Sequence, residues 1–123
     1  MVARGRLGRI GEQMAVRHLE GAGMVIVERN WRCAAGDVRG EVDVVARDGE
    51  VLVFCEVKAR RGSAAGGPLV AVTHAKQSQL RRLAGAYLAA EPQGGRAVRF
   101  DVVGVMWPDG GGGATVDHVR DVC

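Results

Sequence analysis

The chain has 123 residues, of which 47% are hydrophobic and 25% charged, and its formal net charge is +3. This length fits one domain, and the absence of any run of about 18 apolar residues excludes an ordinary membrane-spanning helix. The Arg-bearing start has no signal-peptide core, and the three cysteines form no CxxC pair. We therefore expect a cytoplasmic protein with reduced thiols and no membrane partner.

Helical and strand patterns alternate along the chain, in the order helix 8–21, strand 24–31, hairpin 40–58, helix 73–90, strand 97–106 and a short edge strand at 114–119. Residues 32–39 and 59–68 are predicted to be loops. A strand reached through a helix is usually parallel to the strand before it, so 97–106 should lie beside 51–58. The sequence therefore predicts an α/β fold with a central mixed sheet flanked by helices.

The hairpin at 40–58 carries the charges that bear on function. Its turn is predicted at Asp48-Gly49, since this dipeptide between two Val-rich runs is a strong hairpin signal. In that register Asp43 pairs with Phe54 and Glu41 pairs with Glu56. Directly paired residues share a face of the sheet.

One face of the hairpin is therefore expected to carry three carboxylates and one ammonium, from Glu41, Asp43, Glu56 and Lys58. The other face is expected to carry apolar residues and a thiol, from Val42, Val44, Val51, Val53, Cys55 and Val57. Two carboxylates about 5 Å apart repel by roughly 3 kcal/mol at an effective dielectric near 20, so a cation should lie among them. Oxygen ligands favour Mg²⁺ or Mn²⁺ over zinc.

The spacing D-x(12)-E-x-K on the two arms of a hairpin suits metal-dependent cleavage of phosphodiesters. Two acids hold a metal, the metal lowers the pKa of a water molecule, and the lysine stabilises negative charge. The bland alternative is a strand end with solvated charges. It is disfavoured because residues 51–57 are apolar on both faces, as in a central strand.

Four further charged residues bear on this site. Glu12 lies on an apolar stripe of the first helix, either as a half-exposed first-turn residue beside the helix dipole or as an acid delivered to the hairpin cluster. Arg60 and Arg61 suit a phosphate backbone, with ordinary solvated arginines as the alternative. Lys76 opposes the helix dipole in the first turn of the second helix, which suggests a role outside that helix.

The order of elements and the D…ExK hairpin resemble the core of the PD-(D/E)XK nuclease superfamily. More closely, the chain resembles the bacterial YraN-like uncharacterised family, which is similar in fold to archaeal Holliday-junction resolvases. The matching residues run nearly end to end: Gly8, Gly11, Glu12, Ala15, Leu19, Gly23, Asn30 to Arg32, Gly40 to Asp43, Phe54, Glu56 to Lys58, Arg60, Gly67, Pro68, Ala71, Val72, Lys76 and Arg99 to Val102. The resemblance implies a restriction-endonuclease-like core (αβββαβ) formed by residues 1–123.

The resemblance also implies roles for particular residues. Asp43 and Glu56 would ligate Mg²⁺, with the Val57 carbonyl as a third ligand. Lys58 would be the catalytic lysine, and Glu12 would complete the site. Two more positions, Glu41 and Lys76, match the family but have less settled roles there.

Two functions from different classes remain open. The first is a metal-dependent endonuclease acting on DNA, with branched or junction DNA as a candidate substrate. The second is a catalytically silent nucleic-acid-binding or assembly module that keeps the nuclease fold. The full set of acids plus a lysine favours the first, whereas the small net charge and the 4% aromatic content favour the second. A pseudo-symmetric substrate would favour a homodimer, although the sequence shows no interface.

Overall fold

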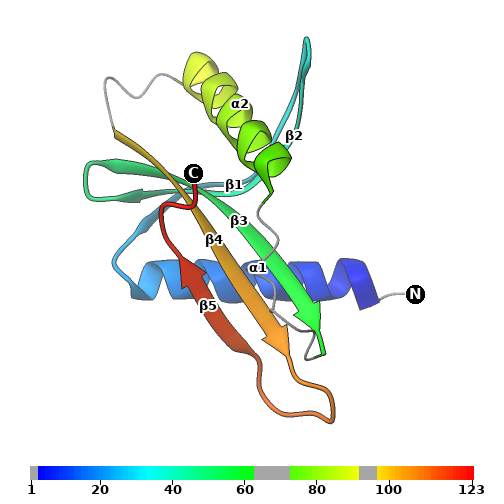
Figure 1. Ribbon diagram of the computed structural model, residues 1–123. Helices are drawn as coiled ribbons and strands as arrows, with labels where there is room; N and C mark the ends of the chain where they lie inside the picture. The colour runs from blue at the N-terminus through cyan, green and yellow to red at the C-terminus, as the bar shows by residue number, and fades with distance from the viewer. Residues whose placement is uncertain (1–2, 63–72, 92–96) are drawn as a thin grey trace.

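The computed structural model describes residues 3–62, 73–91 and 97–123, and it contains a five-stranded sheet with two helices (Figure 1). Its elements are α1 (Ala3–Gly21), β1 (Val25–Ala35), β2 (Val38–Asp48), β3 (Val51–Arg61), α2 (His74–Ala90), β4 (Ala97–Trp107) and β5 (Thr115–Val119). The strand order is β1-β2-β3-β4-β5. The predicted α/β fold is confirmed, and it is consistent with a restriction-endonuclease-like core. Within the described residues, neither helix has the length and apolarity to span a bilayer.

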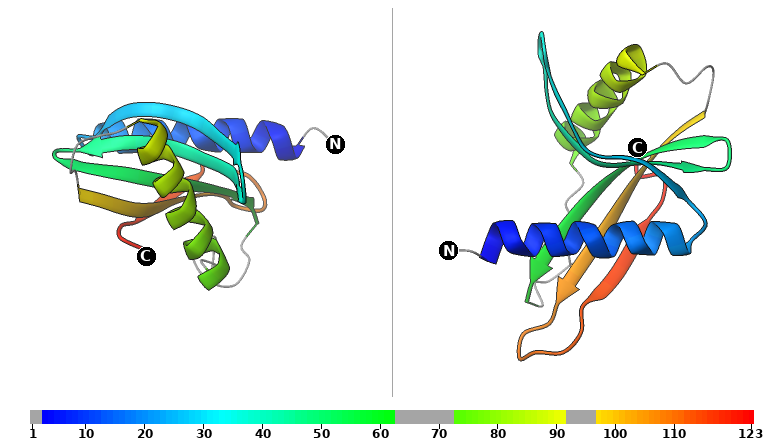
Figure 2. Two further views of the ribbon diagram at one scale, coloured as in Figure 1. Left: turned by 90° about the horizontal axis from the view of Figure 1, so that it is seen from above. Right: turned by 180° about the vertical axis from the view of Figure 1, so that it is seen from behind.

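The two helices cover opposite faces of the sheet (Figures 1 and 2). The core on the α1 face contains Ala15, Val16, Leu19, Met24, Val44, Ala46, Val53, Cys55, Val103 and Val105. The core on the α2 face contains Val42, Val45, Leu52, Phe54, Leu83, Ala84 and Tyr87. Apolar side chains at a helical spacing in α2 meet the sheet, as the pattern predicts. β3 contributes to both cores through its buried residues 52–55, and its charged residues follow where the strand becomes half-buried and then exposed.

The crossover through α2 places β4 parallel to β3. The two strands pair without a register break from Val51–Ala97 to Arg61–Trp107. Thr73 caps α2, and its Oγ1 accepts a hydrogen bond from Lys76 N at 3.1 Å. The predicted parallel pair is confirmed, and β5 is the edge strand beside β4.

The predicted loop at 32–39 is wrong, because this stretch is a hairpin. β1 continues to Ala35 and β2 starts at Val38, and the ladder between them pairs Ala35 with Val38 and Arg32 with Glu41. Gly36 makes the turn with φ of 59°. A Gly-Asp dipeptide is a recognised turn signal. The polar residues on either side concealed the strands.

The predicted register of the β2–β3 hairpin is also wrong, by two residues. Asp48 pairs with Val51, so the turn is Gly49-Glu50, and Val45 faces Phe54. Gly49 has φ of 62° and Glu50 has no positive φ. This is the requirement of a type II′ turn, in which only the first central residue needs positive φ. A shift of two preserves the alternation of faces, so the misplaced turn does not by itself change which residues share a face.

An irregularity of β2 at Asp43 overturns one further assignment, that of Val42 to a face of the sheet. The hairpin pattern predicts that Val42 and Val44 point to the same face of the sheet. In the structure Val42 packs in the α2-side core and Val44 in the α1-side core. The ladder with β3 ends at Val44, and Asn30, which lies across from Asp43 in β1, has φ of 54°. Residues two apart share a face only in a regular strand. The irregularity therefore lies at the residue that the sequence singles out as a metal ligand.

Gly11 lets α1 approach the end of β3. A methyl group built at Gly11 would lie 2.8 Å from Ala59 Cβ, whereas one built at Gly8 meets nothing within 4 Å. We expect Gly11→Ala to destabilise the protein by about 1–3 kcal/mol through overpacking. Gly8→Ala should instead stabilise it by up to about 1 kcal/mol through helix propensity. Urea unfolding of both variants measures this, and equal stabilisation would contradict the contact that positions the neighbouring Glu12.

Candidate active site

Three carboxylates, one from α1 and two from β2, come together in the structure. One ligand oxygen from each of Glu12, Glu41 and Asp43 lies within 4.8 Å of the others, and all three residues are half-buried. Glu12 is not a first-turn residue, because α1 begins at Ala3. The structure thus brings the helix-borne acid to the acids of β2. Arg32 pairs with Glu41 at 3.3 Å, but its side chain is 82% exposed, so this ion pair contributes little.

Asp43 is the most perturbed acid of the group. Burial raises its pKa to about 7; the Val57 N–H opposes the rise, and the charges of Glu12, Glu56 and Glu41 add to it. Its Oδ2 accepts the Val57 N–H at 2.8 Å. This bond holds the carboxylate against β3 beyond the last ladder pair. Repulsion among the acids and loss of solvation both favour the neutral form of Asp43, and a bound cation would favour the charged form.

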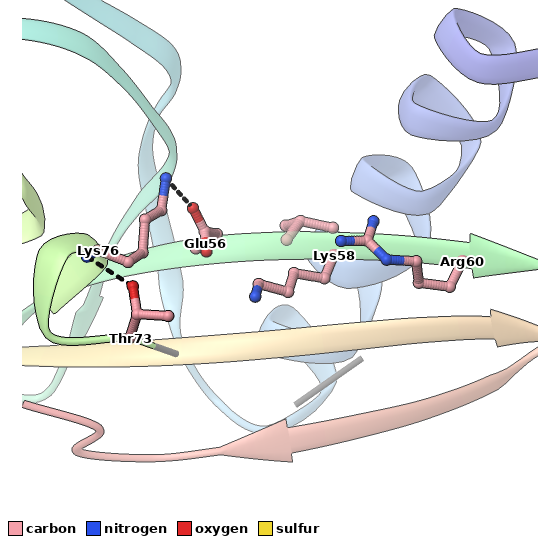
Figure 3. A pocket seen from close by; sticks show the side chains of 6 residues that line it. Glu56, Lys58, Arg60, Thr73 and Lys76 are labelled. Atoms are coloured by element: carbon pink, nitrogen blue, oxygen red, sulfur yellow. Dashed lines mark hydrogen bonds and ion pairs between the residues drawn. The ribbon is translucent and has the colours of Figure 1, made fainter. Parts of the chain in front are cut away.

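Glu56 is not part of this three-acid group: its charge helps to raise the pKa of Asp43, and its carboxylate is paired with a lysine. Its Oε1 is 2.5 Å from Lys76 Nζ (Figure 3). Its Oε2 is buried and has no hydrogen-bond partner in the part of the chain that the structure describes. Lys76 Nζ also donates to Gln79 Oε1 at 3.2 Å. The structure therefore gives Lys76 a direct contact with an expected metal ligand.

A pocket of about 400 Å³ adjoins this ion pair. It is lined by Glu56, Val57, Lys58, Arg60, Thr73 and Lys76 (Figure 3). The three cationic side chains suit an anionic group of a ligand, and the one carboxylate suits a cation bound beside that group. Arg61 is exposed and does not line the pocket. Thr73 was not predicted to line a site. Its position at the start of the second helix, three residues before Lys76, was the available signal.

The donor groups fit a hard divalent cation. The clustered ligand atoms are carboxylate oxygens, which suit Mg²⁺ or Mn²⁺. The raised pKa of Asp43 and the unpartnered Glu56 Oε2 both show negative groups that a cation would stabilise. Cys55 belongs to the α1-side core, where burial raises the pKa of its thiol, so it is no ligand for a soft metal.

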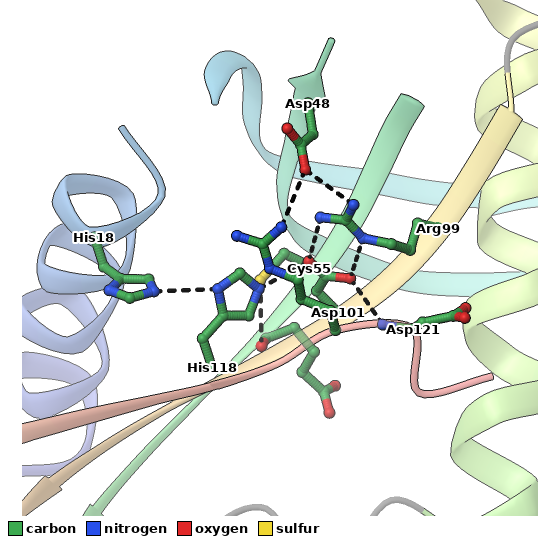
Figure 4. A network of polar contacts seen from close by, with 9 residues as sticks. His18, Asp48, Cys55, Arg99, Asp101, His118 and Asp121 are labelled. Carbon is green, nitrogen blue, oxygen red and sulfur yellow. Dashed lines mark hydrogen bonds and ion pairs between the residues drawn. The ribbon is translucent and has the colours of Figure 1, made fainter. Parts of the chain in front are cut away.

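A second polar network lies away from the pocket, and no sequence pattern predicted it (Figure 4). Its centre is Asp101, which is 0% exposed and accepts two bonds from Arg99 and one from His118, all at 2.8–2.9 Å. His118 Nδ1 lies 3.1 Å from His18 Nε2, joining β5 to α1. Burial would raise the pKa of Asp101, but these hydrogen bonds hold it below its usual value. The network therefore stabilises the ionised acid and ties strands to helix.

Comparison with known proteins gives the family. The model of uncharacterised protein family UPF0102 matches residues 11–105. A UPF0102 protein of Streptomyces coelicolor is 52% identical over 99% of this chain and 92% of its own length. Another from Kineococcus radiotolerans is 52% identical over 98% of this chain and 95% of its own length. The chain belongs to the uncharacterised family UPF0102, the YraN-like family that its sequence resembles.

Proposed function

We propose that this protein is a metal-dependent endonuclease that hydrolyses phosphodiester bonds in DNA. The observation that carries the proposal is the junction of an acid cluster with a basic pocket. The bond from Val57 N to Asp43 Oδ2 joins them, because Val57 lines the pocket and Asp43 belongs to the cluster. A phosphodiester substrate needs both parts: cations for its charge and acids for a metal.

The proposed roles follow from position. Asp43 and Glu56 hold a divalent cation, the Val57 carbonyl is a further donor, and Glu12 and Glu41 add negative charge from the α1 side. A divalent cation at such a site lowers the pKa of water and neutralises phosphate charge. Cationic side chains of β3 then complete the site.

Lys58 stands next to Val57 on β3 and lines the pocket. Its compact ammonium is suited to stabilise the attacking hydroxide or the charge that develops on the phosphate. Arg60 and the exposed Arg61 follow on the same strand, where they can contact flanking phosphates. Action on DNA would place the protein in the cytoplasm, and a two-fold junction substrate would favour a homodimer.

The test is cleavage of labelled four-way-junction, flap and linear duplex DNA in Mn²⁺ or Mg²⁺. Wild-type protein should cleave at least one of them, and Glu56→Ala and Lys58→Ala should each lower the rate by about 10²-fold or more. Circular dichroism confirms that the variants are folded. Equal rates in wild-type and both variants would contradict the proposal, because the cleavage would then not use this site.

One observation favours the alternative of a catalytically silent binding module. The Glu56–Lys76 ion pair neutralises one expected metal ligand within the fold itself. A binding module would hold DNA equally well in EDTA and in Mn²⁺, and it would cut no substrate. Gel-shift measurements in both conditions distinguish the two functions.

A further inference from the structure

We propose that Lys76 is a movable counter-ion that makes metal binding depend on substrate binding. The inference rests on the proposed function and extends it. In the structure the Lys76 ammonium contacts Glu56, and in the inferred complex it contacts a phosphate of the nucleic acid instead. Glu56 is then released to bind the metal.

The first support is that the backbone of α2 does not stabilise this ammonium. Lys76 lies in the first turn of α2, which contains no acid, and a cation there opposes the helix dipole. The ammonium contacts two side chains, those of Glu56 on β3 and Gln79 on α2. Gln79 in turn donates to the Arg39 carbonyl of β2 at 3.3 Å. The ammonium is therefore held by side-chain contacts, and it can exchange them for a contact with a new anion.

The second support is that Glu56 is only half satisfied by this pair. Its side chain is 12% exposed, and Oε2 has no partner among the described residues although Oε1 contacts Lys76. A buried carboxylate oxygen without a partner is costly. The ion pair thus neutralises Glu56 without completing its coordination. A metal would compete with Lys76 for the same carboxylate.

The third support is that Lys76 also lines the pocket with Lys58, Arg60 and Thr73. A phosphate in this pocket offers Lys76 another anion within the same cavity. Lys side chains form flexible point charges that can change partners without a backbone shift. Moving the ammonium to the phosphate leaves Glu56 negative and open to a cation.

The consequence is reciprocal coupling between the two ligands. If the duplex raises metal affinity by some factor, the metal must raise duplex affinity by the same factor. The protein alone would then bind metal weakly, and the metal site would be filled mainly when DNA occupies the pocket.

The experiment measures free Mn²⁺ by electron paramagnetic resonance, with and without a short DNA duplex. The samples are kept cold, and a denaturing gel verifies that the duplex stays intact. Lys76→Met removes the competing ammonium. Arg60→Met is the matched control, because it removes one positive charge from the same pocket without touching Glu56. Lys76→Arg restores the charge, and Lys76→Gln replaces the Met variant if that variant does not fold.

Without DNA, Lys76→Met should bind Mn²⁺ about fivefold or more tightly than wild-type, whereas Arg60→Met and Lys76→Arg should not. The duplex should strengthen Mn²⁺ binding in wild-type by a factor that falls close to one in Lys76→Met. If Lys76→Met binds Mn²⁺ no more tightly than Arg60→Met, the inference is overturned. If wild-type binds no Mn²⁺ in either condition, the proposed function itself fails.

Discussion

Replacing Asp43 by Asn should abolish metal-dependent cleavage and, at the same time, make the metal-free protein more stable near neutral and alkaline pH. The loss of cleavage follows from the removal of a proposed metal ligand at the centre of the acid cluster, and we expect a drop of about 10²-fold or more. The gain in stability follows from the raised pKa of Asp43, about 7 in the folded protein.

The sign of the stability change can be worked out from the proton linkage. Between the ordinary Asp value of 3.8 and about 7, the folded protein binds a proton at Asp43 that the unfolded chain has lost. Asp43 therefore lowers stability as pH rises through this range. The Asn variant is neutral at every pH, and its amide oxygen can still accept the Val57 N–H. Its advantage over wild-type should grow from about pH 4 to about pH 7 and then level off.

Thermal unfolding in EDTA across this pH range measures the difference between wild-type and Asp43→Asn. Asp37→Asn is the control, because Asp37 is exposed in the β1–β2 turn. It should change stability by no more than about 0.5 kcal/mol and leave cleavage intact. A variant at Asp43 that is less stable than wild-type at alkaline pH would show that the acid has a structural role, and would contradict its assignment as an uncompensated charge.

The second large effect is expected at Asp101, away from the proposed chemistry. Asp101→Ala should lower the free energy of unfolding by about 3–5 kcal/mol, because it leaves the largely buried Arg99 guanidinium without its main partner. It also removes the acceptors of His118 and of the Asp121 N–H. Urea unfolding near neutral pH measures this loss.

Asp48→Asn is the matched control, because Asp48 accepts from the same Arg99 at 2.9 Å but is partly exposed. Its cost should be about 1 kcal/mol or less. The folded-state pKa of Asp101 is lowered, so its contribution is present above the ordinary Asp value and disappears as pH falls through the folded value. The gap between wild-type and Asp101→Ala should therefore narrow in acid. A loss of less than about 1 kcal/mol at neutral pH would contradict a central role for this network.

Local patterns in the sequence predicted most of the fold. The apolar strand patterns and the crossover rule predicted the parallel pair of β3 and β4. The turn was misplaced because Asp48-Gly49 and Gly49-Glu50 are both acceptable dipeptides, and only the full ladder chooses between them. The irregularity at Asp43 lies across from Asn30, which has φ of 54° in another strand, and no pattern within β2 indicated it.

At the candidate site, the sequence predicted that acids lie close together, but not which other groups they contact. The sequence predicted that three acids and Lys58 lie on one hairpin. It left two positions open for Glu12, and the start of α1 at Ala3 together with the acid cluster decides between them. The ion pair between Glu56 and Lys76 joins residues from different elements. Such a contact depends on tertiary packing, which neither charge spacing nor helix position encodes.

The most direct test of the central claim is anomalous diffraction from crystals of the protein grown with Mn²⁺ and a short DNA duplex. The claim predicts a manganese peak in contact with the carboxylates of Asp43 and Glu56, with the Lys76 ammonium moved from Glu56 toward a phosphate. A bound duplex with the Glu56–Lys76 pair intact and no manganese at these acids would contradict it.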